Sequence, residues 1–302
     1  MSSSALEAST RRPVAWPTHA RQLALPGVLL AVYASARILE VVHNPVPRTA
    51  VVALDVLAAM SFALFDGARR CGLRRILAFA GICLVVGSLA EELSMATGFP
   101  FGHYRFLELM GPKLIEVPVL LGMAYIGMSY VSWCVARAIL GTSEPALLRS
   151  RLVALPLLAA MVMTAWDLAQ DPVWSTVLHG WTWRDGGAWF GVPVSNYLGW
   201  LGTLFVIYLL FALYLRRDPI PPQIPGASRP PWRALVFYAM CAACNLLQML
   251  PAATPAIVQD PAGRLWRVAT ITTASALVSV FVMGGFVLLA LIRLTKGTGS
   301  TG

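Results

Sequence analysis

The chain has 302 residues, of which 58% are hydrophobic and 12% are charged, and its mean hydropathy is +0.69. Soluble domains carry about 25% charged residues, so this composition excludes an ordinary cytosolic enzyme. The net charge of +9 is compatible with nucleic-acid binding, but basic loops on one side of a membrane explain it without such a partner. We therefore expect an integral membrane protein that contacts the lipid bilayer and no nucleic acid.

Eight apolar segments follow one another along the chain. Each is predicted to be a helix, because lipid cannot satisfy the hydrogen bonds of an open backbone. The alternating ten-residue strand pattern of a membrane barrel does not occur in the sequence. The segments cover residues 23–42, 51–65, 76–97, 115–136, 152–170, 194–215, 234–250 and 268–292.

The fold class is therefore predicted to be all-α, a polytopic membrane helical bundle of about eight transmembrane helices. Segment 51–65 is short for a membrane span, so a bundle of seven helices is the alternative. We expect a single transmembrane domain over residues 21–295, between a disordered cytoplasmic tail at 1–20 and a flexible tail at 296–302.

The basic residues predict the orientation in the membrane. Sixteen Lys and Arg side chains fall in the two tails and in the loops after the second, fourth and sixth segments, whereas six fall in the remaining loops. Loops rich in Lys and Arg stay in the cytoplasm. This distribution places both termini in the cytoplasm and the protein in the inner or cell membrane of a bacterium.

The acidic residues are distributed in the opposite way. Ten of the fourteen Asp and Glu side chains fall in the outer half of the bilayer or in the outer loops. A carboxylate near the centre of a span costs about 2.5–3.5 kcal/mol, so we expect these groups to face a partly wet cavity lined by protein. Several of them lie in the segments themselves, among them Glu40, Asp55, Glu91, Glu116 and Asp167.

One charged pair lies in the first segment. Arg37 is three residues before Glu40, so both side chains share one helical face. This spacing predicts a buried ion pair that fixes helix packing. Asp55 of the second segment is an alternative partner for Arg37.

Asp167 and Asp171 lie one helical turn apart, just before the helix-stopping Pro172. Two such acids cannot both ionise cheaply in a low-dielectric site, so one of them is expected to keep its proton. A neutral carboxyl group beside an ionised one is the arrangement that general acid catalysis uses. A solvated helix end at the membrane surface is the alternative interpretation.

Two loops on the outer side, residues 97–106 and 174–200, are dense in aromatic residues and glycine. Trp and Tyr favour the headgroup region, so an interfacial belt is one explanation. Because each loop adjoins a helix that carries acids, we instead expect the loops to cap the cavity. Aromatic faces there can stabilise a carbocation by cation–π attraction.

These motifs together resemble one family. Glu91 is followed by Thr-Gly-Phe-Pro-Phe-Gly-His-Tyr at 97–104, and Thr-Ala-Trp-Asp-Leu-Ala-Gln-Asp-Pro at 164–172 is followed by Trp-Phe-Gly-Val-Pro-Val-Ser-Asn-Tyr-Leu-Gly-Trp at 189–200. Over about residues 80–215 the chain resembles the integral-membrane carotenoid biosynthesis family. That family contains carotenoid 1,2-hydratases of the γ-carotene and bisanhydrobacterioruberin type.

The resemblance implies a hydro-lyase reaction. Water is added across the terminal double bond of an acyclic ψ-end group, and the product is a tertiary alcohol. The chemistry needs a proton donor and a water molecule but no redox cofactor and no metal. The implied partners are a carotenoid substrate dissolved in the bilayer and, as candidates, other enzymes of the same pathway.

The resemblance also implies roles for individual residues. Asp167 is the predicted proton donor, Asp171 or Glu91 is the base on the water side, and Asn196 orients the water or the acid. Phe106 stands where Tyr is expected in many members, so no hydroxyl role is assigned to it. The residues expected to bind the substrate are Tyr104, Trp166, Trp183, Trp200, Phe101 and His103.

Two other functions are compatible with the sequence. The pair Asp167-x-x-x-Asp171 matches one of the two acidic motifs of UbiA-like prenyltransferases, which hold magnesium and a diphosphate, although an Asn-x-x-x-Asp partner motif does not occur. Acids inside a membrane also mark proton relays. A non-catalytic carotenoid- or lipid-binding protein, or a transporter, is therefore the other alternative.

Overall fold

A computed structural model describes residues 19–42, 44–141, 151–224, 226, 229–250 and 256–296. Within these residues the chain forms eight long helices, which confirms the all-α prediction. The eighth is continuous from α9 (Val268–Leu277) through a π-helical segment (Val278–Met283) to α10 (Gly284–Lys296). The first seven are α1 (His19–Val41), α2 (Arg48–Cys71), α3 (Leu73–Thr97), α4 (Val119–Leu140), α6 (Ala154–Pro172), α7 (Val194–Arg217) and α8 (Trp232–Asn245).

Helix α2 corresponds to segment 51–65, whose short length was the reason for the seven-helix alternative. It has 24 residues, which is enough to cross a bilayer, so the short segment that favoured the seven-helix alternative belongs to a helix of full length. The apolar segment looks shorter in the sequence because Asp66 and Arg70 interrupt it. Both side chains are buried, and Arg70 Nε lies 2.7 Å from Asp66 Oδ2. An ion pair of this kind offsets much of the cost of burying each charge alone, so the helix continues to Cys71.

Five of the described helices are long and apolar enough to cross a membrane, namely α2, α3, α4, α7 and the continuous α9–α10 helix. This is the pattern of an integral membrane protein. Most of the two predicted tails, residues 1–18 and 297–302, lies outside the described residues. Within them, α1 begins at His19 and α10 ends at Lys296.

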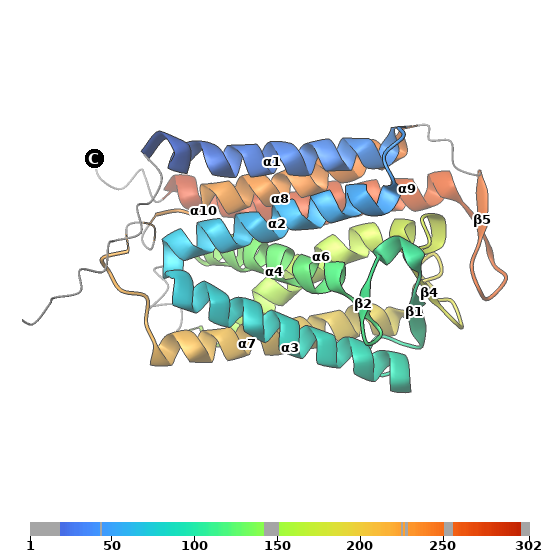
Figure 1. Cartoon of the computed structure of the whole chain (residues 1–302), viewed down its shortest axis with the longest axis horizontal. Coiled ribbons are helices and arrows are strands. Elements are labelled where there is room, and N and C mark those ends of the chain that lie inside the picture. Colours follow the sequence, from blue (N-terminus) through green and yellow to red (C-terminus); the bar gives the residue numbers. More distant parts are fainter. Residues whose placement is uncertain are drawn as a thin grey trace, which may run out of the picture.

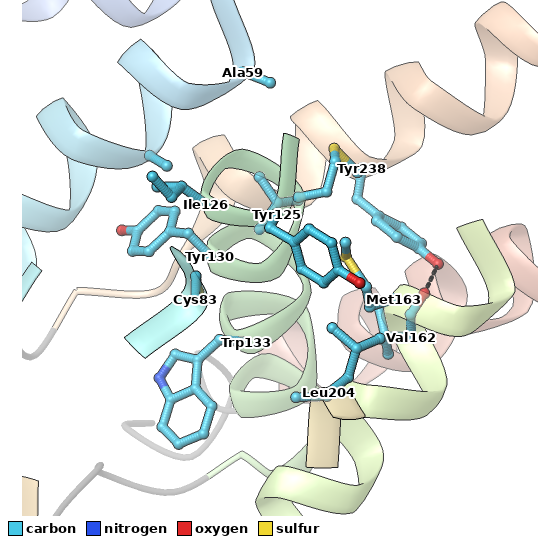
Figure 2. Close-up of a cluster of buried hydrophobic side chains, with 14 of the residues drawn as sticks. Ala59, Cys83, Tyr125, Ile126, Tyr130, Trp133, Val162, Met163, Leu204 and Tyr238 are labelled. Atoms are coloured by element: carbon cyan, nitrogen blue, oxygen red, sulfur yellow. Dashed lines mark hydrogen bonds between the residues drawn. The ribbon is translucent and has the colours of Figure 1, made fainter. Parts of the chain in front are cut away.

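Helix α4 lies at the centre of the bundle. Its most apolar stretch is 83% buried, compared with 33–50% for the other four long apolar helices. Figure 2 shows Tyr125, Tyr130 and Trp133 extending from α4 among side chains of the surrounding helices. A helix that is apolar on all sides is expected to be buried on all sides. Close approach is possible because α4 carries Gly127, where a Cβ atom would lie 2.9 Å from Ala59 of α2.

Three short antiparallel strand pairs gather at one end of the bundle, which we call the loop end (Figure 1). Strand β1 (Tyr104–Phe106) pairs with β4 (Trp181–Trp183), and Tyr104 is opposite Trp183. The apolar pattern predicts none of these strands, because each has only two or three residues. The β1–β4 pair joins the two aromatic loops predicted to form a cap. The other pairs are β2 (Lys113–Leu114) with β3 (Val117–Pro118), and β5 (Ile257–Gln259) with β6 (Leu265–Arg267).

Candidate functional site

A cavity lies between the helices near the loop end. The empty space there is about 880 Å³, a volume that includes open solvent. Its walls are mostly apolar and aromatic, with a few convergent polar groups, which is the usual composition of a small-molecule site. The polar lining residues on α2, α3, α6 and α7 are Asp55, Glu91, Asp167, Gln170, Asp171 and Asn196.

Asp167 and Asp171 lie side by side in this cavity, on the last turns of α6. They are 6% and 2% exposed, so the alternative of a solvated helix end is wrong. Asn196 of α7 connects them, because its Nδ2 lies 2.6 Å from Asp171 Oδ2 and 3.4 Å from Asp167 Oδ2. Trp181 of β4 donates a second hydrogen bond of 2.7 Å to Asp171 Oδ1. Asp171 therefore accepts two N–H donors, whereas Asp167 accepts one long one.

Helix α6 ends at Pro172, as the sequence predicts, and the chain then forms a π-helical turn at Val173–Val177. Proline has no N–H and cannot continue the α-helical ladder. The turn leads directly to β4, which carries Trp181 to Asp171. The local backbone thus brings the aromatic loop back over the two acids.

Glu91 of α3 is the third acid in the cavity and is 3% exposed. Tyr125 of α4 donates a hydrogen bond of 2.7 Å to Glu91 Oε1, and Tyr104 donates one to Glu91 Oε2. The neighbouring Glu92 has a different role, because its Oε1 accepts the backbone N–H of Glu116. Glu91 is therefore the member of this pair that faces the cavity.

Aromatic rings form much of the cavity wall. The rings of Tyr104 and Trp183 lie 5.7 Å apart, and Tyr125 stacks on Trp200 at 5.0 Å with an interplanar angle of 9°. Tyr104, Trp166, Trp183 and Trp200 all line the cavity, as the sequence predicts. The indole Nε1 of Trp166 is buried and has no hydrogen-bond partner among the described residues.

Two predicted substrate-binding residues do not line this cavity. Phe101 is 1% exposed and packs behind the wall, with its ring 6.4 Å from Tyr104 and 6.3 Å from Trp200. Its carbonyl oxygen accepts the indole N–H of Trp183. His103 lies in the same loop, and its carbonyl oxygen accepts the backbone N–H of Arg184. Phe101 therefore supports the wall from behind, whereas the His103 ring lies beside Gly98.

Glu116 corrects the sequence-based interpretation. It was expected inside a span and facing the cavity, but α4 begins only at Val119. Residues 113–118 instead form the β2–β3 turn. The Glu116 side chain is 63% exposed and lies 3.9 Å from Lys113. The apolar pattern extended the segment too far, because Leu114 and Ile115 are exposed hairpin residues.

The predicted pair of Arg37 and Glu40 is present in α1. Arg37 Nη1 lies 2.6 Å from Glu40 Oε2 and 3.8 Å from Asp55 Oδ2, so both predicted partners contact Arg37. Asp55 also lines the cavity, as expected for an acid within a segment. Tyr125 was not predicted at all, because α4 is apolar on every side and its sequence pattern marks no functional face.

Comparison with known proteins identifies the family of this chain. No curated protein and no solved structure matches the chain significantly. A family model described as "Carotenoid biosynthesis protein" matches residues 48–259. The match includes α2 to α8 and every acid that lines the cavity. Since it covers well over half of the 302 residues, the chain belongs to the carotenoid biosynthesis protein family.

Proposed function

We propose that this protein is a carotenoid hydratase, which adds water to the terminal double bond of an acyclic ψ-end group. The observation that carries the proposal is the pair Asp167 and Asp171, held by one amide group in an aromatic cavity between membrane helices. Membership of the family supports a role in carotenoid biosynthesis. The chemistry of the cavity supports hydration by acid catalysis.

Asp167 supplies the proton in this mechanism. It has only the 3.4 Å contact from Asn196, whereas Asp171 accepts Asn196 and Trp181 at 2.6 and 2.7 Å. Hydrogen bonds from N–H groups favour the ionised form of a carboxyl group. Asp171 is therefore the carboxylate and Asp167 the neutral acid.

The reaction then proceeds in two steps. Asp167 transfers its proton to the less substituted carbon of the double bond, whose π electrons form the new C–H bond, and a tertiary cation results. A water oxygen forms a C–O bond to that cation and releases one proton to Asp171. Electron-rich aromatic faces such as those of Trp183 and Trp166 stabilise the cation. The product is a tertiary alcohol.

The Asn196 amide also explains how Asp167 and Asp171 return to their starting protonation states. After one turnover Asp167 is ionised and Asp171 carries the proton, which is the reverse of the starting state. A proton passed from Asp171 to Asp167 restores it without exchange with solvent. Asn196 contacts both carboxyl groups, so the proton has to pass only from one side of a single amide group to the other. Each cycle therefore consumes one water and no net proton.

The test is mass spectrometry of carotenoids from cells that make an acyclic precursor, with and without this protein. We expect the pigment to gain the mass of one water per modified end. Asp167→Asn should lower the yield at least about 100-fold, because general acid catalysis contributes about 10²–10⁴-fold. Glu92→Gln is the matched control, since Glu92 contacts the β2–β3 turn instead of the cavity, and it should retain activity.

Two outcomes would contradict the proposal. A pigment bound to the wild-type protein with unchanged mass would indicate the non-catalytic carrier. Condensation of a prenyl diphosphate in the presence of magnesium would indicate the prenyltransferase. Full hydration by Asp167→Asn would keep the function but reject Asp167 as the donor.

A further inference from the structure

A second polar cluster connects the cavity to a separate pocket at the loop end. Asp55 lines the cavity, whereas Glu40 lines the pocket. Arg37 lies between them and contacts both, at 2.6 Å from Glu40 Oε2 and 3.8 Å from Asp55 Oδ2. The three side chains thus form a continuous polar connection between the two spaces.

This cluster is buried but not fully hydrogen-bonded. The side chains of Arg37, Glu40 and Asp55 are 1%, 6% and 13% exposed. Glu40 Oε1 and Asp55 Oδ1 are buried and have no hydrogen-bond partner among the described residues. Buried polar atoms in folded proteins are nearly always hydrogen-bonded, to ordered water where no protein group serves. Both oxygens therefore suit water binding.

The pocket on the Glu40 side has polar groups among a larger number of Val and Leu side chains. Its empty space is about 950 Å³, including open solvent, and it contains Asn44, Arg48, Gln248 and Thr272. It lies at the loop end, where α1 ends and α2 begins. Solvent in this pocket reaches Glu40, the first member of the cluster.

We propose that Glu40, Arg37 and Asp55 form the path by which water enters the cavity. The inference rests on the proposed hydratase function, which consumes one water per double bond inside a largely apolar space. A fixed Arg in a water path admits neutral water and opposes the passage of cations and protons. That selectivity suits a cycle with no net proton uptake.

The path is also held rigidly. Arg37 Nη2 donates a hydrogen bond of 3.1 Å to Asn245 Oδ1 of α8, and Asn245 Nδ2 donates one of 3.0 Å to Ser279 Oγ. Ser279 lies in the π-helical segment between α9 and α10. Four helical elements therefore fix the position of one guanidinium group.

The experiment measures water exchange in the resting protein, without substrate. The purified protein is mixed rapidly with water labelled with heavy oxygen, and X-ray pulses then generate hydroxyl radicals from the water that is present. Mass spectrometry follows heavy oxygen in oxidised Met128, which lines the cavity. Met163 is the internal control, because it is fully buried and does not line the cavity.

We expect Met128 to acquire heavy oxygen and Met163 to remain unlabelled. Glu40→Leu removes the polar step and should slow exchange at Met128 at least tenfold, whereas Glu40→Gln keeps a polar side chain of similar shape and should leave exchange within twofold of wild type. If Glu40→Leu does not fold, Val51→Phe narrows the same pocket without removing a charge and should slow exchange equally.

Exchange at Met128 that is unchanged in Glu40→Leu or Val51→Phe overturns the path, and so does the absence of heavy oxygen at Met128 in the wild type. These results are independent of turnover. A protein that hydrates carotenoids but exchanges water independently of Glu40 would keep the proposed function and lose only this inference. A protein with Glu40-dependent exchange and no hydration would lose the proposed function.

Discussion

Asn196 contacts both acids of the pair, so a change of its side chain affects the proton donor and the base at once. Asn196→Ala removes both contacts, and we expect the rate of hydration to fall about 10²–10³-fold, as for loss of one preorganised donor in other active sites. The measurement is the initial rate in membranes that contain an acyclic carotene. Ser195→Ala, one residue earlier on the exposed side of α7, should keep the wild-type rate. Equal losses in both variants would contradict the role of Asn196.

Glu91 is the other acid expected on the water side of the reaction, where it would orient the reacting water for Asp171. Tyr125 positions Glu91 through a hydrogen bond of 2.7 Å. A hydrogen bond to a charged group contributes about 1.5–3 kcal/mol, which corresponds to a loss of about 10–100-fold in rate if all of it acts on the reaction. We therefore expect Tyr125→Phe to lower the hydration rate within this range while its ring still stacks on Trp200. The comparison of initial rates requires equal amounts of folded protein.

The matched control is Tyr238→Phe. Tyr238 donates a hydrogen bond of 2.7 Å to the carbonyl oxygen of Val162 in the core, away from the cavity lining (Figure 2). The variant Tyr238→Phe removes a buried hydroxyl group just as Tyr125→Phe does. It should lower the unfolding temperature but leave the hydration rate unchanged. If Tyr238→Phe impairs hydration as strongly, the effect of Tyr125→Phe is one of stability.

The sequence predicted some of these residues and missed others for physical reasons. Asp167 and Asp171 share a helical face because of their spacing, and Asn196 and Trp183 came from the family motif. Neither residue spacing nor the family motif singles out Tyr125. Helix periodicity does not show which of Glu91 and Glu92 faces the cavity, because α3 is apolar on most of its circumference, so Glu91 came from the family motif alone.

At the scale of helices, the α2–α4 contact depends on a small residue. A Cβ atom at Gly127 would lie 2.9 Å from the Cβ and carbonyl carbon of Ala59, one of which is backbone. Overpacking of this kind costs about 1–3 kcal/mol. We expect Gly127→Ala to lower the unfolding temperature in detergent.

Gly81 of α3 is the matched control. A Cβ atom there meets nothing within 4 Å, and Ala is favoured over Gly in a helix by about 1 kcal/mol. Gly81→Ala should therefore leave stability unchanged or raise it. A loss of stability at position 81 as large as that at position 127 would show that steric contact is not the cause.

The helices were predictable to within a few residues because each contains a long apolar run. Segments 76–97 and 194–215 correspond to α3 (Leu73–Thr97) and α7 (Val194–Arg217). The strand pairs at the loop end were not predictable, because pairing between β1 and β4 joins loops that are far apart in the sequence, with α4 and α6 between them. No local pattern in the sequence encodes such a contact.

At the scale of the whole molecule, the distribution of Lys and Arg predicts that the loop end faces away from the cytoplasm. A fluorescent protein fused after Gly302 should therefore fold and fluoresce, because this reporter matures in the cytoplasm. The same reporter inserted at Gly263, in the turn between β5 and β6, should remain dark. Alkaline phosphatase at the same two positions should give the opposite result. Fluorescence at position 263 would reverse the predicted orientation.

The position of the acids along the bundle has a consequence for symmetrical pigments. Glu91, Asp167 and Asn196 all lie near the ends of their helices at the loop end, so under the proposed function the reaction takes place in a single leaflet. A polyene long enough to cross a hydrocarbon core of about 30 Å presents only one tip to that leaflet at a time. Under the proposed chemistry, a diol can form only after the intermediate alcohol leaves, turns end over end and returns. Singly hydroxylated pigment should therefore accumulate before the doubly hydroxylated form.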